Sequence, residues 1–465
     1  MSSRPQLVAG AVHAVAIVTI WLLAIVIYAL AFTRGPALGW VAIDGVLIAA
    51  GGWVLHTHRD ALGFAVLGPR KLGKLLAIVA FSIGCVALVQ LLIADRGGIW
   101  LDETNYLATL REGQIQRDGV FPFNLRWLEP MLAGPLNIFP ASDAAALKAV
   151  NFGAFVVAAV YLVLLLLRLG VKLTIAFSAP VFLLCSYLGV YGASNRLVLD
   201  PFNYALFVIV FHTLIRREHA AYFAAALLVT ACNSEKAVYW IPVFALVELV
   251  RGGGLIPAAK HTLKYCGPAL LYLVAIRLYL WGSPSESQLF LENLHVLGFS
   301  WHEPQIVDET VKLNRFQHLW FPFGGFTVYA LLGFTTCARW LKPIMLLLVP
   351  VLLSTLIATD TQRMVAYAFI VYLPFGLLYL ARAFGELPLR WSRVLFGLTI
   401  ALAVAEFYLF PMVRRFRSYE LGAAVFEHRD AIQLALAALE VTLVGTIVFL
   451  HHTFGRAISR ASAPR

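Results

Sequence analysis

Residues 143–167 read DAAALKAVNFGAFVVAAVYLVLLLL, and the only charges in this run, Asp143 and Lys148, lie near its start. As a helix the run is roughly 38 Å long at about 1.5 Å per residue, which is enough to cross a hydrocarbon core of about 30 Å. Its apolar residues are continuous rather than alternating, so a helix is favoured over a membrane strand.

Similar apolar runs recur along all 465 residues, of which 61% are hydrophobic and 13% are charged. Soluble domains carry about a quarter charged residues, so this chain has too few charges to cover a water-facing surface. The sequence predicts one all-α transmembrane domain, residues 1–465, with about 12–14 transmembrane helices. The expected spans are 13–33, 38–56, 76–95, 143–167, 173–191, 201–215, 220–232, 238–250, 265–281, 321–338, 343–359, 364–381, 394–411 and 431–450.

The basic residues are distributed unevenly between the two sides of this topology. One side holds 20 Lys and Arg residues against three acidic residues, Asp60, Glu218 and Glu386. By the positive-inside rule both termini are cytoplasmic, and the long loops 96–142 and 282–320 are extracytoplasmic. The same rule accounts for the net charge of +11 without a nucleic-acid partner.

Two features that can mislead are the cysteines and the first apolar run. The five cysteines lie mostly within apolar runs and form no Cys-x-x-Cys pair, so buried thiols are favoured over a disulfide framework or a zinc site. The first run, residues 14–32, is longer than a signal-peptide core and is interpreted as a retained helix.

The segment with the most chemical content begins loop 96–142. Asp102 and Glu103 follow the third predicted helix, and Tyr106 lies four residues after Asp102, on the same face of a helix. Residues 104–117 have the pattern of an amphipathic helix on the membrane surface. The alternative is that both acids are only helix-start carboxylates at a solvated boundary.

Cations occur on the same predicted face. They are Arg126, Arg196, Lys236 in the polar turn Asn233-Ser234-Glu235-Lys236, and Arg363, which follows Asp360 at the start of a helix. Each has a structural alternative as an interfacial anchor, a turn residue or a helix cap. Together, a carboxylate base and phosphate-binding cations are what transfer from a lipid-phosphate donor requires.

Two further features leave alternatives open. Loop 282–320 contains histidines and acids, including His302 and Glu303, but this pattern is too short to define a metal site, so no cofactor is predicted and a divalent metal is the alternative. Glu440 lies within an apolar span, where a carboxyl is costly; it indicates either a hydrogen bond to a neighbouring helix or a proton path.

The layout resembles the GT-C membrane glycosyltransferases, and Asp102-Glu103 with Tyr106 is similar to the Asp-Glu-x-x-Tyr form of the protein-mannosyltransferase and aminoarabinose-transferase branch. Arg126-x-Leu128-x-Pro130 and Asp360-x-x-Arg363 resemble elements of uncharacterised bacterial members. In the family the acidic loop usually follows the first helix, whereas here it follows the third. The resemblance implies a multi-pass protein of the bacterial inner membrane.

The resemblance also implies an activity. A sugar would be transferred on the outer face from a polyprenyl-phosphate donor to a glycan, lipid or protein acceptor. Asp102 would be the general base and Glu103 its partner, and Arg363 would bind the donor phosphate. Arg126, Arg196 and Lys236 are further phosphate-binding candidates, supported by Tyr106, Glu235 and Asp360. The alternatives are a secondary transporter or lipid flippase, an O-antigen polymerase or ligase, and a non-catalytic scaffold.

Overall fold

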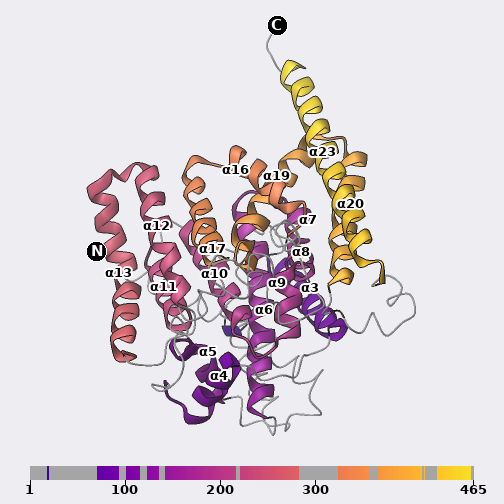
Figure 1. Ribbon diagram of the computed structural model, residues 1–465. Helices are drawn as coiled ribbons and strands as arrows, with labels where there is room; N and C mark the ends of the chain where they lie inside the picture. The colour runs from indigo at the N-terminus through magenta and orange to yellow at the C-terminus, as the bar shows by residue number, and fades with distance from the viewer. Residues whose placement is uncertain are drawn as a thin grey trace, which may run out of the picture. The chain divides into compact units, whose positions relative to one another are not determined.

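The structure is a computed structural model, and every regular element that it describes is a helix (Figure 1). It describes residues 18–19, 71–93, 101–115, 123–135, 142–215, 220–281, 323–355, 365–410, 413 and 427–461. The predicted spans 13–33 and 38–56 lie almost wholly outside these residues, as do loop 282–320 and the Asp360-x-x-Arg363 segment.

Five described helices are long and apolar enough to cross a membrane. They are α3 (Lys71–Leu92), α6 (Asp143–Arg168), α19 (Phe369–Glu386), α20 (Leu389–Leu409) and α23 (Arg429–Ala461). The segments Leu173–Cys185 and Tyr187–Ser194 are bent by 53° relative to each other, and they make a sixth membrane-length element if they are counted as one span. The expectation of an all-α chain with several membrane-length helices is therefore confirmed for the described residues.

The predicted span 173–191 is broken into α7 (Leu173–Ala176), α8 (Ala179–Cys185) and α9 (Tyr187–Ser194). The backbone becomes extended at Ser186, with φ −73° and ψ 165°. Gly189 permits the bend, because a Cβ there would collide with the backbone of Leu184. The apolar run located the segment, with its end predicted three residues too early, but it carried no signal for this close backbone approach.

The chain divides into two compact units, and the first comprises described residues within 1–87, 95–165 and 195–298. Beside α6 it contains α4 (Leu101–Glu112), the 3₁₀ turn η2 (Phe123–Leu125), α5 (Leu128–Ala133) and α10 (Asp200–Ile215). Next come α11 (Ala220–Asn233), the 3₁₀ turn η5 (Glu235–Tyr239), α12 (Trp240–Glu248), the π turn η6 (Leu249–Gly253) and α13 (Leu255–Tyr279). Helices α11, α12 and α13 pack side by side (Figure 1).

Helix α4 differs from the amphipathic surface helix predicted over residues 104–117. It begins at Leu101 and ends at Glu112, and Tyr106, Leu107 and Leu110 are buried in an apolar cluster with α5 and α6. The polar side chains of Glu103 and Asn105 are buried as well. The mixed composition of α4 therefore reflects packing inside the first unit rather than a boundary between lipid and water.

The second unit comprises described residues within 88–94, 166–194 and 299–465. It contains α7–α9, α16 (Phe326–Thr336), η8 (Arg339–Leu347), α17 (Leu348–Thr355), α19, α20 and α23. Helices α16 and α19 approach closely at two glycines: a Cβ at Gly333 would collide with the backbone carbonyl of Phe375, and a Cβ at Gly376 would lie 2.7 Å from the Phe326 ring. Small residues allow this contact, as is common between membrane helices.

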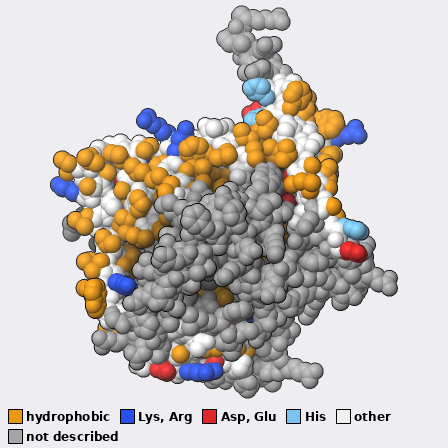
Figure 2. Space-filling view, in the orientation of Figure 1, with side chains coloured by type: hydrophobic (Ala, Val, Ile, Leu, Met, Phe, Trp, Pro, Cys, Tyr) orange, Lys and Arg blue, Asp and Glu red, His pale blue; other side chains and the backbone are white. Residues whose placement is uncertain are grey.

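Large apolar side chains remain exposed on the outer helices. Leu255, Leu263 and Leu271 on α13 and Leu434 and Phe449 on α23 are each more than 65% exposed. Figure 2 shows apolar side chains over much of the described part of this face. Such contiguous apolar exposure is costly in water and is typical of a surface that another apolar phase covers.

Candidate functional site

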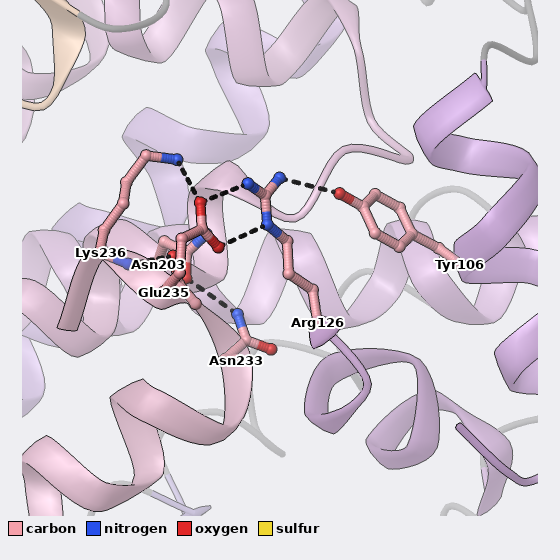
Figure 3. Close-up of polar contacts among 7 residues, drawn as sticks. Tyr106, Arg126, Asn203, Asn233, Glu235 and Lys236 are labelled. Atoms are coloured by element: carbon pink, nitrogen blue, oxygen red, sulfur yellow. Dashed lines mark hydrogen bonds and ion pairs between the residues drawn. The ribbon is translucent and has the colours of Figure 1, made fainter. Parts of the chain in front are cut away.

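A network of charged side chains lies in the first unit, centred on Arg126 between η2 and α5 (Figure 3). The Arg126 Nη2 atom is 2.7 Å from Oε1 of Glu235, and its Nε donates to Oε2 at 3.3 Å. Lys236 Nζ is 3.8 Å from the same Glu235 Oε1. Arg126 and Lys236 are buried, so one carboxylate holds two cations that have little access to solvent.

The third interaction of Arg126 connects the network to the acidic motif. Arg126 Nη1 donates a hydrogen bond of 3.2 Å to the hydroxyl of Tyr106 on α4. Tyr106 is fully buried, and its helix is held against α5 and α6 by Leu107 and Leu110. The helix that carries Asp102 and Glu103 is thus fixed directly to the cations.

The polar turn 233–236 has the tight geometry that its composition predicts. Ser234 is extended, with φ −159°, and its Oγ accepts from the backbone N–H of Lys236, an interaction that caps the start of η5. Asn233 connects three elements: its Oδ1 accepts from the N–H of Glu129 at 3.1 Å, and its Nδ2 donates to Oδ1 of Asn203 at 3.0 Å. These bonds fix α5 and α10 against the turn.

The ionisation of Glu235 follows from its partners. Burial alone would raise its pKa, but the positive charges of Arg126 and Lys236 and the hydrogen bonds from Arg126 outweigh this and lower the pKa to about 2. One third of the side chain is exposed, so solvent screens part of this effect. Glu235 is therefore a carboxylate at neutral pH.

Glu129 on α5 has the opposite environment. It is fully buried, and neither carboxyl oxygen has a hydrogen-bond partner among the described residues. Burial, and secondarily the negative charge of Asp200, raise its pKa well above the ordinary glutamate value. Glu129 therefore favours its neutral, protonated form more strongly than an exposed glutamate does, a few residues from the ionised pair of Arg126 and Glu235.

Four of the residues singled out from sequence meet in this network: Tyr106, Arg126, Glu235 and Lys236. Arg126 was also open to interpretation as an anchor at the membrane interface, but its guanidinium points to Glu235. That choice depends on tertiary structure, since Glu235 is 109 residues away.

The remaining predicted site residues take no part in the contacts given above, or they lie outside the residues that the structure describes. Asp102 is in the first turn of α4, where the structure describes its backbone but not its side chain, and Glu103 is buried beside it. Arg196 is half-buried before α10, and its carbonyl accepts from Asn151 on α6. Asp360 and Arg363 lie outside the described residues.

Sequence reasoning assigned no site role to Glu129, Asn203 or Asp200. Their polarity could have pointed to them, because each of these polar side chains interrupts or starts an apolar helix. A buried polar group costs free energy unless a hydrogen bond or an ion pair compensates for it. Where the structure is described, no three His, Cys, Asp or Glu side chains converge in a way that would hold a metal ion.

The fold and this network define the class of the chain as a helical protein with several membrane-length helices and a buried ionic network in its first unit. Comparison with protein-family models, curated proteins and solved structures finds no significant match.

Proposed function

We propose that this chain is a multi-pass membrane glycosyltransferase of the GT-C type, which moves a sugar from a polyprenyl-phosphate donor to an acceptor on the extracytoplasmic face. The single observation that carries this proposal is the hydrogen bond from Arg126 to Tyr106, which joins the Asp-Glu-x-x-Tyr helix to a buried pair of cations. An acidic motif held beside phosphate-binding cations is the arrangement that such a transfer requires.

The cations suit a phosphate. Arg126 presents a planar fork, which pairs with carboxylate or phosphate through two hydrogen bonds, and Lys236 adds a second charge. In this arrangement the Glu235 carboxylate occupies the fork. A donor phosphate would replace Glu235 or share the cations with it, from the side on which Glu235 is exposed. Arg196 and Arg363 are proposed as additional donor contacts.

An apolar groove supports a lipid-linked donor. The groove, of about 410 Å³, is lined by α12 and α13 side chains that are almost all apolar, among them Ile241, Leu246, Leu263 and Leu270. Ile241 lies five residues after Lys236 on the segment that leaves the polar turn, roughly 7 Å along a helix. A prenyl chain lying in the groove would direct its phosphate end toward the turn.

The proposed reaction uses the acidic motif as follows. The Asp102 carboxylate takes the proton of an acceptor hydroxyl, whose oxygen then attacks the anomeric carbon of the sugar. The bond from this carbon to the phosphate oxygen breaks, and the polyprenyl phosphate leaves with its electron pair. Glu103 orients the acceptor. The cations stabilise the charge that grows on the leaving phosphate, so their effect is larger in the transition state than in the ground state.

Asp102→Asn tests the base. It keeps the size of the side chain and removes its basicity, so transfer from the polyprenyl-phosphate sugar should fall by about 10²–10⁴-fold. The matched control is Asp143→Asn, which removes an ion pair with the exposed Arg111 elsewhere in the first unit and should leave the rate unchanged. A well-folded, monodisperse Asp102→Asn variant with normal turnover would disprove the assignment.

Arg363→Lys and Arg363→Ala test the donor site. Lysine keeps the charge but loses the fork, so binding of a short polyprenyl phosphate to the purified protein should weaken in both variants, and more in the alanine variant. Equal affinity in both variants and in the wild type would assign Arg363 a structural role.

We further propose that the chain resides in a bacterial plasma membrane with both termini cytoplasmic. The 20-to-3 excess of basic over acidic residues on one side supports this orientation.

A further inference from the structure

Two buried carboxyl groups meet in the second unit, and the proposed reaction uses neither of them. The carboxyl groups of Glu406 near the end of α20 and Glu440 within α23 lie side by side, with oxygens of both within 3 Å of one point, the position that a Cβ on Gly324 would occupy. The backbone N–H of Gly325, just before α16, donates to Glu440 Oε2 at 3.0 Å. Gly324 makes room for both: a Cβ there would lie 2.6 Å from the Glu440 oxygens and 2.9 Å from Glu406 Oε2, and its φ is +51°.

The pair lines a small cavity of about 30 Å³. This is enough for a water molecule, which needs roughly 10–15 Å³. Glu406 is 8% exposed, and its Oε1 has no hydrogen-bond partner among the described residues. The two glutamates thus line a space that can hold one polar ligand.

The other groups around the cavity are neutral. Its titratable side chains besides the two glutamates are Cys185 from α8 and Tyr329 from α16. Helix α19 contributes Leu373 to the lining, and its Tyr379 stacks on Tyr329. No Lys, Arg or His is among the described residues that line the cavity.

We propose that Glu406 and Glu440 form a proton-binding site that holds one shared proton. Two ionised carboxylates this close in a buried site repel each other and, both being acceptors, cannot hydrogen-bond, whereas a proton on one of them lets it donate to the other. The N–H of Gly325 favours the anionic form of Glu440, which places the proton on Glu406. The two-carboxyl site titrates as a pair, and the cavity water is the group through which its proton exchanges.

The site lies where α20 and α23 pack together. Loss of the shared proton leaves two facing carboxylates, which repel each other strongly where solvent is scarce. The packing of α23 on α20 and on the segment before α16 therefore depends on this proton. The inference does not rest on the proposed glycosyl transfer.

Labelling with an apolar carbodiimide tests the site, because this reagent reacts with protonated carboxyl groups. On the wild-type protein in detergent at neutral pH, the peptides that contain Glu406 or Glu440 should carry about tenfold more label than the one that contains Glu248. Glu248 is the matched control: it is equally buried, but it forms ion pairs with Arg251 and with His261. Equal labelling of all three would overturn the proposal.

The infrared carbonyl band of a protonated carboxyl is a second measure that needs no catalytic activity. Glu129→Gln serves as the background, because the buried Glu129 carboxyl can add to the same band. In this background the protein should show the band at neutral pH, and adding Glu406→Gln, which supplies an N–H donor in place of the proton, should remove it without loss of folding. A band that persists in the double variant would contradict the location of the proton. Suppression of the carbodiimide labelling by sodium or magnesium ions would replace the proton site with a cation site.

Discussion

The Tyr106 hydroxyl shows how one atom connects parts of the chain that are distant in sequence. The phenol ring belongs to the apolar cluster that holds α4 in place, while its oxygen accepts from Arg126. Arg126 in turn reaches Glu235 in the turn after α11. A buried cation needs all of its partners, because each N–H that is left without one costs free energy that water no longer repays.

Tyr106→Phe should therefore destabilise the protein. The ring packing remains, but one buried N–H of Arg126 loses its acceptor, and a cost of about 1–3 kcal/mol is expected. Thermal unfolding in detergent measures it. Tyr265→Phe is the control, because the described contacts of that half-buried tyrosine are made by its ring. Equal melting temperatures for the two variants would show that the Tyr106 hydroxyl contributes nothing.

Glu129 should make stability depend on pH. Its pKa is raised by burial and by Asp200, so the folded state binds a proton more tightly than the unfolded chain does. The free energy of unfolding then falls as pH rises above the ordinary glutamate pKa of about 4.3. Glu129→Gln, which is neutral at every pH, should flatten this decline and be at least as stable as wild type at pH 7.

Unfolding measured between pH 4 and pH 8 tests this expectation for Glu129, with the exposed Glu112→Gln as the control. A decline with the same slope in wild type and in Glu129→Gln would show that Glu129 is ionised in the folded protein.

Among the helices, α16 and α19 show how small residues set the distance between elements. Gly333 brings its backbone against that of Phe375, and Gly376 receives the ring of Phe326. Close van der Waals contact of this kind is a main source of association between helices in lipid, where no hydrophobic driving force acts between them. These glycines permit that contact, and no other residue type leaves the backbone as accessible.

Gly333→Ala should push α16 and α19 apart. The added methyl meets backbone rather than a movable side chain, so overpacking should cost about 1–3 kcal/mol or more in unfolding experiments. Gly397→Ala is the matched control: this exposed glycine of α20 has open space around its Cβ position. Alanine there should be neutral or stabilise the helix by up to about 1 kcal/mol. Equal effects of the two variants would argue against close packing at Gly333.

For the whole molecule, the exposed apolar surface and the charge distribution together predict a membrane protein whose loop 96–142 is extracytoplasmic. In cells, Gln114→Cys, in the loop predicted to be outside, should react with a membrane-impermeant thiol reagent added externally. Arg339→Cys, on the side predicted to be cytoplasmic, should react only after permeabilisation. Both positions are exposed, and the native cysteines are buried or half-buried, which keeps background labelling low. The reverse pattern would invert the topology and refute an extracytoplasmic reaction.

The sequence alone predicted that the chain is helical and where its most continuous apolar helix lies. The run of residues 143–167 became α6, with its end moved by one residue, because a continuous apolar stretch of this length has one satisfactory backbone conformation in lipid. The turn at Asn233-Ser234-Glu235-Lys236 was equally readable, since short polar side chains compete with helical hydrogen bonds and interrupt an apolar helix.

Only the tertiary structure decided what the polar residues do. Local sequence describes Arg126 equally well as an interfacial anchor or as half of a buried ion pair, and its Glu235 partner lies 109 residues away. The Glu129 environment and the meeting of Glu406 with Glu440 are likewise products of packing between distant helices. Hydrophobic periodicity is a local property of the chain, whereas desolvation and charge pairing depend on which elements the fold brings together.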